Sequence, residues 1–181
     1  MRPAGYLVNT GGGIEGEPGQ FYDYILAQNG LFIRAQNPLL EATVLIAPAE
    51  ARGLRPLREG VRLTRGKMPR YLYDLAISVL CADRLQERYA AVTWHDGYHL
   101  EMPPQEGRSA GVSYERLPGT ALDIHSHGAM KAFFSMTDNQ DEQGLGLYMV
   151  VGKLDTLIPE VLLRVGVYGY FAPIETGEVF D

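Results

Sequence analysis

Two histidines, His125 and His127, stand two residues apart in a segment whose pattern predicts a β-strand over residues 121–127. Side chains alternate between the two faces of a strand, so both imidazoles should point the same way, with Ile124 and Ser126 on the opposite face. Two imidazoles placed like this can bind one metal ion. A His-x-His pair standing alone is more often a surface or structural feature, so a metal site needs further ligands.

A carboxylate in a suitable position follows the histidines. Ser135, with Asp138 three residues later, has the pattern of a helix start in which serine caps the first turn. Asp138 would then lie where the helix dipole favours a carboxylate. Seven residues separate His127 from Ser135, enough for the chain to leave the strand and return to the same place. We therefore expect His125, His127 and Asp138 to bind one metal ion.

Two imidazoles and one carboxylate leave the fourth tetrahedral position to water, which is the arrangement of catalytic rather than structural zinc. Bound zinc lowers the pKa of water to about 7 and polarises a carbonyl group. A nearby glutamate would move the proton from water to the leaving group, and the Ser135 hydroxyl could stabilise the oxyanion. These residues predict a hydrolase with Zn²⁺ as its cofactor.

The complete spacing, His-x-His-x7-Ser-x-x-Asp, is far more specific than two histidines. It resembles the JAMM signature of JAB/MPN-domain metalloproteases, which this chain matches at His125, Ser126, His127, Ser135 and Asp138. Residues 69–174 resemble the helix, hairpin, metal strand and second helix of a prokaryotic JAB domain. The surrounding segments 22–34, 132–135 and 164–170 are similar to PRTRC system protein A, a bacterial JAB-like family, and this likeness covers nearly the whole chain.

The resemblance also implies a catalytic glutamate near the junction of the first helix and the strand after it. Glu87 is in that position, with Glu101 and Glu115 as weaker candidates. A negative charge at a helix end opposes the dipole, which favours a special role for Glu87 over that of a solvated side chain. One residue departs from the family pattern, because Gly128 follows the second histidine where many members have proline. This change removes no ligand, but it affects the loop and the fit of a substrate.

Five other polar residues near the motif have simpler interpretations. His95 and His99 flank an Asp-Gly turn and are expected to be exposed rather than to bind metal. Asp123 shares the face of the histidines, where its carboxylate could orient a metal ligand. Asp141 and Glu142 are expected to cap the helix that contains Asp138.

The family resemblance implies hydrolysis of a peptide or isopeptide bond at the carboxyl-terminal tail of a ubiquitin-like protein, in maturation or deconjugation. The implied partners are that ubiquitin-like substrate and E1/E2-like proteins, with no nucleic acid and no membrane. Two alternatives stay open: a non-catalytic JAB-like scaffold that binds a partner, and a zinc hydrolase of a small amide. The scaffold usually lacks a metal ligand, and all three are present here.

Composition is consistent with a soluble globular protein. The chain has 181 residues, a formal net charge of −6 and 46% apolar residues. An arginine-rich stretch over 52–70 is expected to be a solvated surface or a contact for an acidic partner rather than a nucleic-acid footprint. The single cysteine excludes an internal disulfide. The lack of a long apolar run or a secretory signal predicts a cytoplasmic protein, of undetermined oligomeric state.

The sequence divides into an amino-terminal β-rich extension, residues 1–60, and a JAB/MPN-like domain, residues 61–181. Residues 1–20 are expected to form a flexible loop, since the G-x-G-x-x-G pattern of Gly11, Gly13 and Gly16 is followed by acidic residues instead of a helix. Residues 52–67 read as a charged connector. The extension is expected to cover the site, recognise a partner or support a dimer, and the sequence does not choose among these roles.

Periodicity and turn residues predict the remaining elements. Helices are expected over 69–88, where apolar residues recur at helical spacing, and over 135–144. Asn-Gly and Asp-Gly pairs mark two hairpins. The expected strands are 21–27, 31–35, 43–47, 91–95, 98–102, 112–114, 121–127, 147–153 and 161–171. This order predicts a mixed α/β fold, with a JAB/MPN-like mixed sheet flanked by helices.

Overall fold

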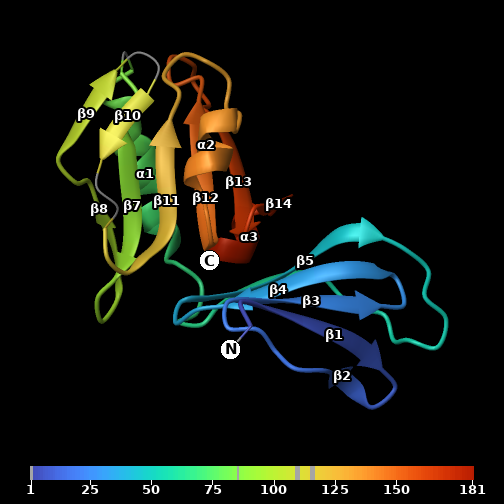
Figure 1. The fold of residues 1–181 in the computed structure, drawn as a ribbon. Coiled ribbons are helices and arrows are strands. Elements are labelled where there is room, and N and C mark those ends of the chain that lie inside the picture. Colours follow the sequence, from blue (N-terminus) through green and yellow to red (C-terminus); the bar gives the residue numbers. More distant parts are fainter. Residues whose placement is uncertain (1, 85, 109–110, 115–116) are drawn as a thin grey trace. The chain divides into compact units, whose positions relative to one another are not determined.

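The computed structural model describes residues 2–84, 86–108, 111–114 and 117–181. It contains two six-stranded mixed sheets, a separate two-stranded hairpin and few helices (Figure 1), so the mixed α/β class is confirmed. The chain divides into two compact units. The first comprises Met1–Arg65, Gln143–Leu145 and Val165–Ala172, and the second comprises Gly66–Glu142, Gly146–Arg164 and Pro173–Asp181.

The first sheet has the strand order β2-β1-β3-β4-β5-β6. Its strands are β1 (Ala4–Thr10), β2 (Gly13–Glu15), β3 (Tyr22–Ala27), β4 (Gly30–Gln36), β5 (Leu40–Pro48) and β6 (Gly60–Leu63). Strands β1 and β3 pair in parallel, whereas β3, β4, β5 and β6 pair antiparallel in sequence. One cluster of its core contains Leu7, Ile25, Ala27 and Phe32. The expected strands at 21–27, 31–35 and 43–47 are confirmed.

Two expectations for this part of the chain were wrong. Residues 1–20 do not form a flexible loop, because β1 and β2 make an antiparallel hairpin in which Val8 pairs with Glu15. Of the glycine pattern, Gly11 lies in the turn, Gly13 begins β2 and Gly16 follows it. The connector at 52–67 contains β6, whose Val61 pairs with Ala42 of β5. The short strands β2 and β6 form by pairing with β1 and β5, and local composition does not reveal such partners.

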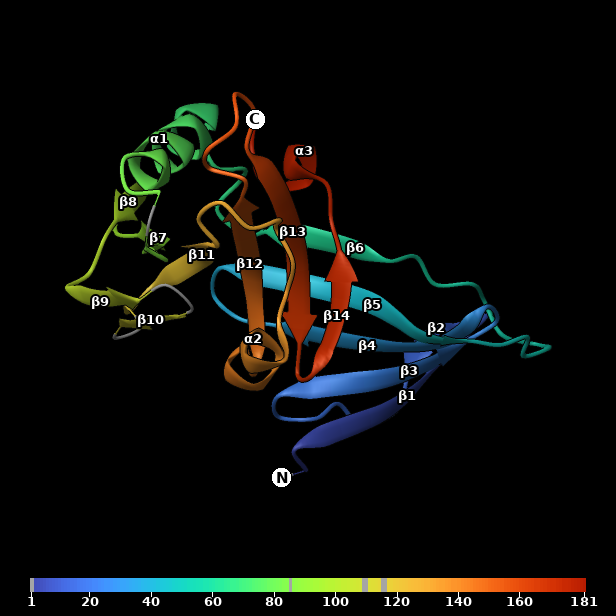
Figure 2. The same cartoon turned by 90° about the horizontal axis from the view of Figure 1, so that it is seen from above.

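The second sheet has the strand order β14-β13-β12-β11-β7-β8. Its strands are β7 (Tyr89–Trp94), β8 (Tyr98–Glu101), β11 (Thr120–Ser126), β12 (Leu145–Gly152), β13 (Glu160–Val167) and β14 (Tyr170–Pro173). Figure 2 shows β12, β13 and β14 side by side. Strand β11 pairs antiparallel with β7 and parallel with β12. Strand β11 thus lies inside the sheet, and most of its residues are buried, including Leu122 and Ile124.

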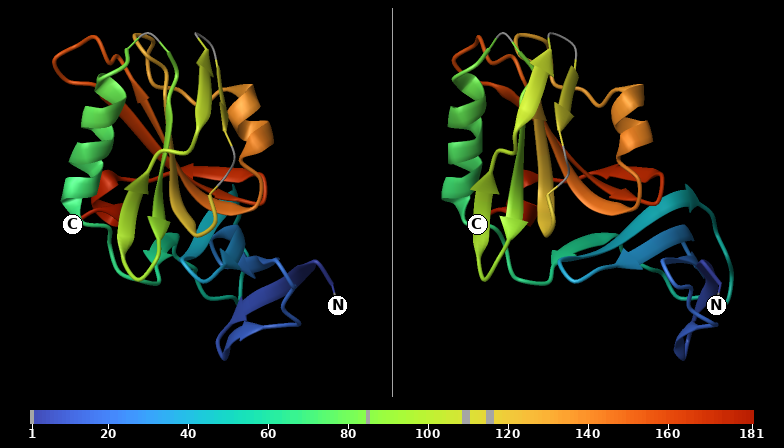
Figure 3. Two further views of the ribbon diagram at one scale, coloured as in Figure 1. Left: turned by 90° about the vertical axis from the view of Figure 1, so that its left-hand side faces the viewer. Right: turned by 60° about the vertical axis from the view of Figure 1, so that its left-hand side comes forward.

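The first helix, α1 (Arg70–Cys81), buries Leu72, Ala76 and Leu80 and lies against β7 and β8 (Figure 3). It begins after Pro69 as expected but ends several residues before the predicted residue 88. Beyond the helix the Arg88 guanidinium binds Asp83, with Nε 3.0 Å from Oδ2. The Arg88 amide donates to Ser126 of β11, a long-range contact that directs the chain into β7 at Tyr89.

Two predicted segments differ in detail. Residues 103–119 contain a hairpin of β9 (Gln105–Arg108) and β10 (Gly111–Tyr114), where only the second strand was expected. The single strand expected over 161–171 is two strands, β13 and β14. They are separated by Tyr168 and Gly169, whose φ angles are 48° and 89°. Two successive positive φ angles are typical of a tight hairpin turn, which reverses the chain between β13 and β14.

Two short helices complete the fold: α2 (Met136–Asp141) and α3 (Thr176–Val179). Helix α2 falls within the range expected from Ser135 to Gly144. None of the helices in the described part of the chain has both the length and the apolar character required to cross a membrane.

Candidate metal centre

Strand β11 brings the two histidines together. His125 is the penultimate residue of the strand and pairs with Tyr89 of β7 and Val150 of β12. His127 lies just past the strand, but its amide donates to the Val151 carbonyl at 2.8 Å and so continues the pairing with β12. The two imidazole rings consequently face one side, with their centroids 5.1 Å apart.

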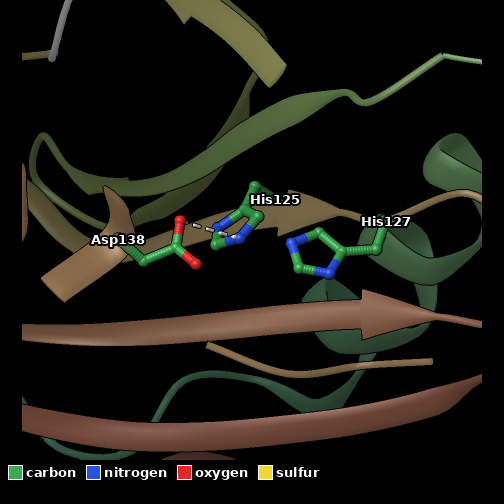
Figure 4. A group of neighbouring side chains, drawn as sticks. All are labelled: His125, His127 and Asp138. Carbon is green, nitrogen blue, oxygen red and sulfur yellow. Dashed lines mark ion pairs between the residues drawn. The ribbon is translucent and has the colours of Figure 1, made fainter. Parts of the chain in front are cut away.

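The start of α2 supplies the third side chain. The Ser135 hydroxyl accepts a hydrogen bond from the Asp138 amide at 3.1 Å, and the Asp138 carboxylate accepts one from the Ser135 amide at 2.5 Å. These reciprocal bonds form a capping box, which confirms the predicted helix start. They also fix the Asp138 side chain in the first turn of α2. In Figure 4, Asp138 points toward His125 and His127.

The candidate ligand atoms of His125, His127 and Asp138 all lie within 4.8 Å of one another. Within the described residues, this is the group of His, Cys, Asp and Glu side chains that can surround a single ion. Nε2 of His125 lies 3.5 Å from Oδ1 of Asp138, an ion-pair distance that is too long for a good hydrogen bond.

Two ring nitrogens of this group have unused hydrogen-bonding capacity. Nε2 of His125 and Nδ1 of His127 are buried, and neither has a hydrogen-bond partner in the described part of the structure. A buried polar atom without a partner costs free energy and calls for an explanation. In neutral imidazole one ring nitrogen carries a lone pair that can bind a metal ion. A cation held by His125 and Asp138 would therefore satisfy Nε2 of His125.

The charge states of the three side chains suit a cation. Burial lowers the pKa of His125 to about 4, although the Asp138 carboxylate raises it. Burial also lowers the pKa of His127 below its ordinary value. For Asp138, burial raises the pKa, but His125 and the hydrogen bonds with Ser135 together lower it below its ordinary value. At neutral pH the site therefore offers two neutral imidazoles and a carboxylate, the protonation states that metal binding requires.

Glu87 lies in the connection between α1 and β7, one residue before a tight contact with the histidine strand. The Arg88 amide donates to the Ser126 hydroxyl, and the Ser126 amide donates to the Arg88 carbonyl. Burial raises the pKa of Glu87, and the negative charge of Asp138 raises it further. Glu87 is thus close enough to Asp138 for their charges to interact. A raised pKa suits a group that must accept and release a proton near neutral pH.

The other candidate bases and histidines are placed differently. Glu101 accepts a hydrogen bond from the Thr93 hydroxyl at 2.5 Å and lies 3.5 Å from Nε2 of His95. Glu115 lies outside the described residues. His95 and His99 flank the β7–β8 turn, are exposed as expected, and do not belong to the group of metal-ligating side chains.

The residue after the second histidine has a conformation that explains its identity. Gly128 has φ = +56°, a value that proline cannot adopt. A Cβ atom at this position would also lie 3.0 Å from the Arg84 carbonyl oxygen. The departure from the family pattern therefore corresponds to a specific loop path, rather than to the looser loop that a glycine would suggest.

The sequence analysis missed several contacts around the site. Arg164 of β13 binds Glu142 at the end of α2, where helix capping alone had been expected for that glutamate. Asp123 accepts a hydrogen bond from the buried Tyr89 hydroxyl. The sequence contained one signal of the Arg164–Glu142 pair, which was an arginine within the apolar segment 161–167. A buried ion pair explains a charged residue in such a segment.

Gln105 was also missed. Its side-chain amide accepts a hydrogen bond from the Tyr89 amide at 2.7 Å and donates one to the Tyr89 carbonyl at 2.9 Å. These bonds attach the start of the β9–β10 hairpin to the residue that pairs with His125.

Comparisons with models of known protein families and with curated proteins find no match to this chain. A functional proposal therefore depends on the geometry of the metal centre and on the resemblance of its motif.

Proposed function

We propose that the protein is a zinc-dependent hydrolase in which His125, His127 and Asp138 bind one zinc ion. The observation that carries this proposal is the convergence of three ligand side chains whose ligand atoms lie within 4.8 Å of one another, beside a buried Nε2 of His125 that has no hydrogen-bond partner in the described part of the structure. Two nitrogens and one carboxylate oxygen match the ligand set of catalytic zinc, which leaves one coordination position open.

A zinc ion bound there supplies Lewis acidity, which makes a water molecule nucleophilic at neutral pH. Glu87 accepts the proton of the attacking water at its carboxylate and passes it to the leaving nitrogen. Ser135 contributes its hydroxyl, since capping Asp138 uses only an oxygen lone pair. The O–H proton of Ser135 is then free to turn toward the oxyanion that forms at the carbonyl under attack.

The substrate we propose is the flexible carboxyl-terminal tail of a ubiquitin-like protein, cut at a peptide or isopeptide bond. The motif's resemblance to the JAB/MPN metalloproteases supports this class. A tail could bind as an added strand, with main-chain hydrogen bonds giving affinity. Strand β8 is an edge strand of its sheet. The β9–β10 hairpin starts at Gln105, which is hydrogen-bonded to Tyr89, the residue that pairs with His125. Both offer strand edges in the compact unit that contains the metal centre.

The test combines metal analysis with a cleavage assay. Purified protein reconstituted with Zn²⁺ is expected to contain about one zinc per chain, and His125→Ala is expected to lose it. The zinc form is then incubated with the ubiquitin-like protein encoded beside it, extended at its carboxyl terminus by a fluorescent peptide. Mass spectrometry should detect one cut at the tail, abolished by a chelator and restored by Zn²⁺. Enlarging the residue before the cut should reduce cleavage more than changing the globular surface.

The possible outcomes separate the three candidate functions. Tight binding of the tail without cleavage would favour the scaffold, and hydrolysis of a small amide without cleavage of the tail would favour a small-amide hydrolase. His99→Ala is the matched control, because His99 is exposed and lies outside the metal group. Loss of zinc in His99→Ala, or full zinc content in His125→Ala, would contradict the assignment of the ligands.

A further inference from the structure

Arg164 of β13 is a buried charged residue, 7% exposed, in a run of buried apolar side chains. Its guanidinium uses three nitrogens on two partners from α2 and its end. Nε and Nη2 donate to Oε2 of Glu142 at 2.8 and 2.5 Å, and Nη1 donates to Oδ1 of Asn139 at 2.7 Å. Such a planar fork fixes the direction of its partners as well as their distance.

The same guanidinium reaches the segment before the helix. Its central carbon lies 3.7 Å from the centre of the Phe134 ring, a cation–π contact immediately before the capping residue Ser135. Arg164 therefore contacts residues before α2, within it and at its carboxyl end. Asp138, the carboxylate of the metal centre, lies between these points of attachment.

Helix α2 does not bury an apolar face. It contains six residues, and none of them is buried. A single short helix is not stable in water by itself, and tertiary packing of an apolar face usually provides its stability. Because no residue of α2 is buried, polar contacts take the place of an apolar face, and the bonds from Arg164 attach the helix to β13.

We propose that Arg164 is a positioning residue for the metal centre, which holds α2 on β13 so that Asp138 stays within reach of His125 and His127. This inference rests on the proposed function, because it assumes that these three side chains bind a metal ion. Arg164 acts through Glu142, Asn139 and Phe134, and the effect of removing it should appear as weaker metal binding.

Whether metal binding becomes weaker or tighter when Arg164 is replaced distinguishes a positioning role from a purely electrostatic one. The positive charge of Arg164 acts on His125, where it disfavours a second positive charge. Replacing Arg164 by a neutral residue would therefore strengthen metal binding if charge were its only influence, whatever the protonation state of Glu142. If Arg164 positions α2, the same replacement weakens binding.

The variants are Arg164→Met, which keeps most of the side-chain volume, and Arg164→Lys, which keeps the charge but lacks the fork. Zn²⁺ affinity is measured by competition with a chromogenic chelator at neutral pH. Changes beside metal ligands typically cost 10- to 100-fold in affinity, and we expect Arg164→Met to bind zinc about that much more weakly. Arg164→Lys should be intermediate, since a single ammonium nitrogen cannot reproduce the planar fork that bonds Glu142 twice and Asn139 once.

Arg34→Met is the matched control, because Arg34 pairs with Asp23 at 3.2 Å in the other compact unit. Its zinc affinity should stay within about twofold of the wild type. Unchanged or tighter zinc binding in a folded Arg164→Met protein would overturn the inference. If Arg164→Met does not fold, wild-type affinity in Arg164→Lys would overturn it.

Hydrogen exchange of the metal-free proteins separates this inference from the proposed function. The amides of Asp138 and Glu142, which donate to Ser135 Oγ and the Asp138 carbonyl, should exchange at least about tenfold faster in Arg164→Met, while those of β11 should not change. Unchanged exchange in α2 would overturn the positioning role even if zinc binds. A wild-type protein that binds no zinc would refute the proposed function, and faster exchange in α2 would then still establish that Arg164 holds the helix.

Discussion

The backbone of Arg88 is paired with Ser126 through two hydrogen bonds, one to the serine hydroxyl at 3.0 Å and one from the serine amide at 2.9 Å. Ser126 stands between the two histidines and is fully buried. Its side chain therefore fixes the chain next to Glu87, although it lies on the face away from the metal centre. This serine belongs to the motif for a structural reason.

Replacing Ser126 by alanine should destabilise the protein and reduce its activity. The Arg88 amide would lose its acceptor, and an unsatisfied buried donor costs about 1–3 kcal/mol. Thermal unfolding should detect the loss. Ser78→Ala is the control, because the Ser78 hydroxyl binds the Asp74 carbonyl on the exposed side of α1. Equal melting temperatures for Ser126→Ala and Ser78→Ala would contradict this role.

Glu87→Gln should keep zinc and lose most of the hydrolytic activity, by about 10²- to 10⁴-fold, because an amide of the same shape cannot accept the proton. The measurement is kcat, alongside the zinc content of the same preparation. Glu101→Gln serves as its counterpart, since Glu101 is already paired with Thr93. Full activity in Glu87→Gln together with a large loss in Glu101→Gln would transfer the role of the base to Glu101.

Ser135 caps α2 and is proposed to stabilise the oxyanion, and substitution can separate these two roles. Glycine is nearly as good as serine at a helix N-cap, so Ser135→Gly should cost only a few tenths of a kcal/mol. It removes the hydroxyl, however, and loss of an oxyanion donor lowers kcat by about 10²- to 10³-fold. Ser135→Thr retains both roles and should stay active. Wild-type kcat in Ser135→Gly would show that the hydroxyl serves only the helix cap.

The stability of the metal-free protein should depend on the protonation of His125. Burial lowers the pKa of His125 from 6.5 to about 4, so the unfolded chain binds more protons between these values. The contribution of His125 is therefore present above pH 6.5 and is lost as the pH falls toward 4. Each tenfold difference in proton affinity between the folded and unfolded chains corresponds to about 1.4 kcal/mol of stability. Denaturant unfolding with a chelator, from pH 4 to 7, measures this slope.

The ionisation of Glu142 changes the stability of the protein in the opposite direction over the same pH range. Burial raises its pKa from 4.5 to about 7, outweighing the Arg164 guanidinium, which lowers it. Its contribution is present below pH 4.5 and is lost as the pH rises toward 7. Relative to the wild type, His125→Ala should gain less stability as the pH rises, and Glu142→Gln should gain more. Parallel curves for all three proteins would refute both assignments.

The sequence by itself determined the elements that depend on local pattern. Alternation along residues 121–127 put His125 and His127 on one face, since a strand allows no other arrangement at this spacing. The Ser135–Asp138 capping box is equally local, because both of its hydrogen bonds close within one helical turn. Turn residues likewise located the hairpins at Asn29-Gly30 and Asp96-Gly97. These local rules supplied every candidate ligand.

Only the tertiary structure decided what surrounds those ligands. The path after the early end of α1 depends on Arg88 binding Ser126 of β11, and the strand β1 depends on its pairing with β3. Above all, no local pattern joins Arg164 to Glu142, which are 22 residues apart in the chain. A buried ion pair requires two distant segments to pack together and exclude water. Its two partners can therefore be identified only from the folded arrangement of the sheet and α2.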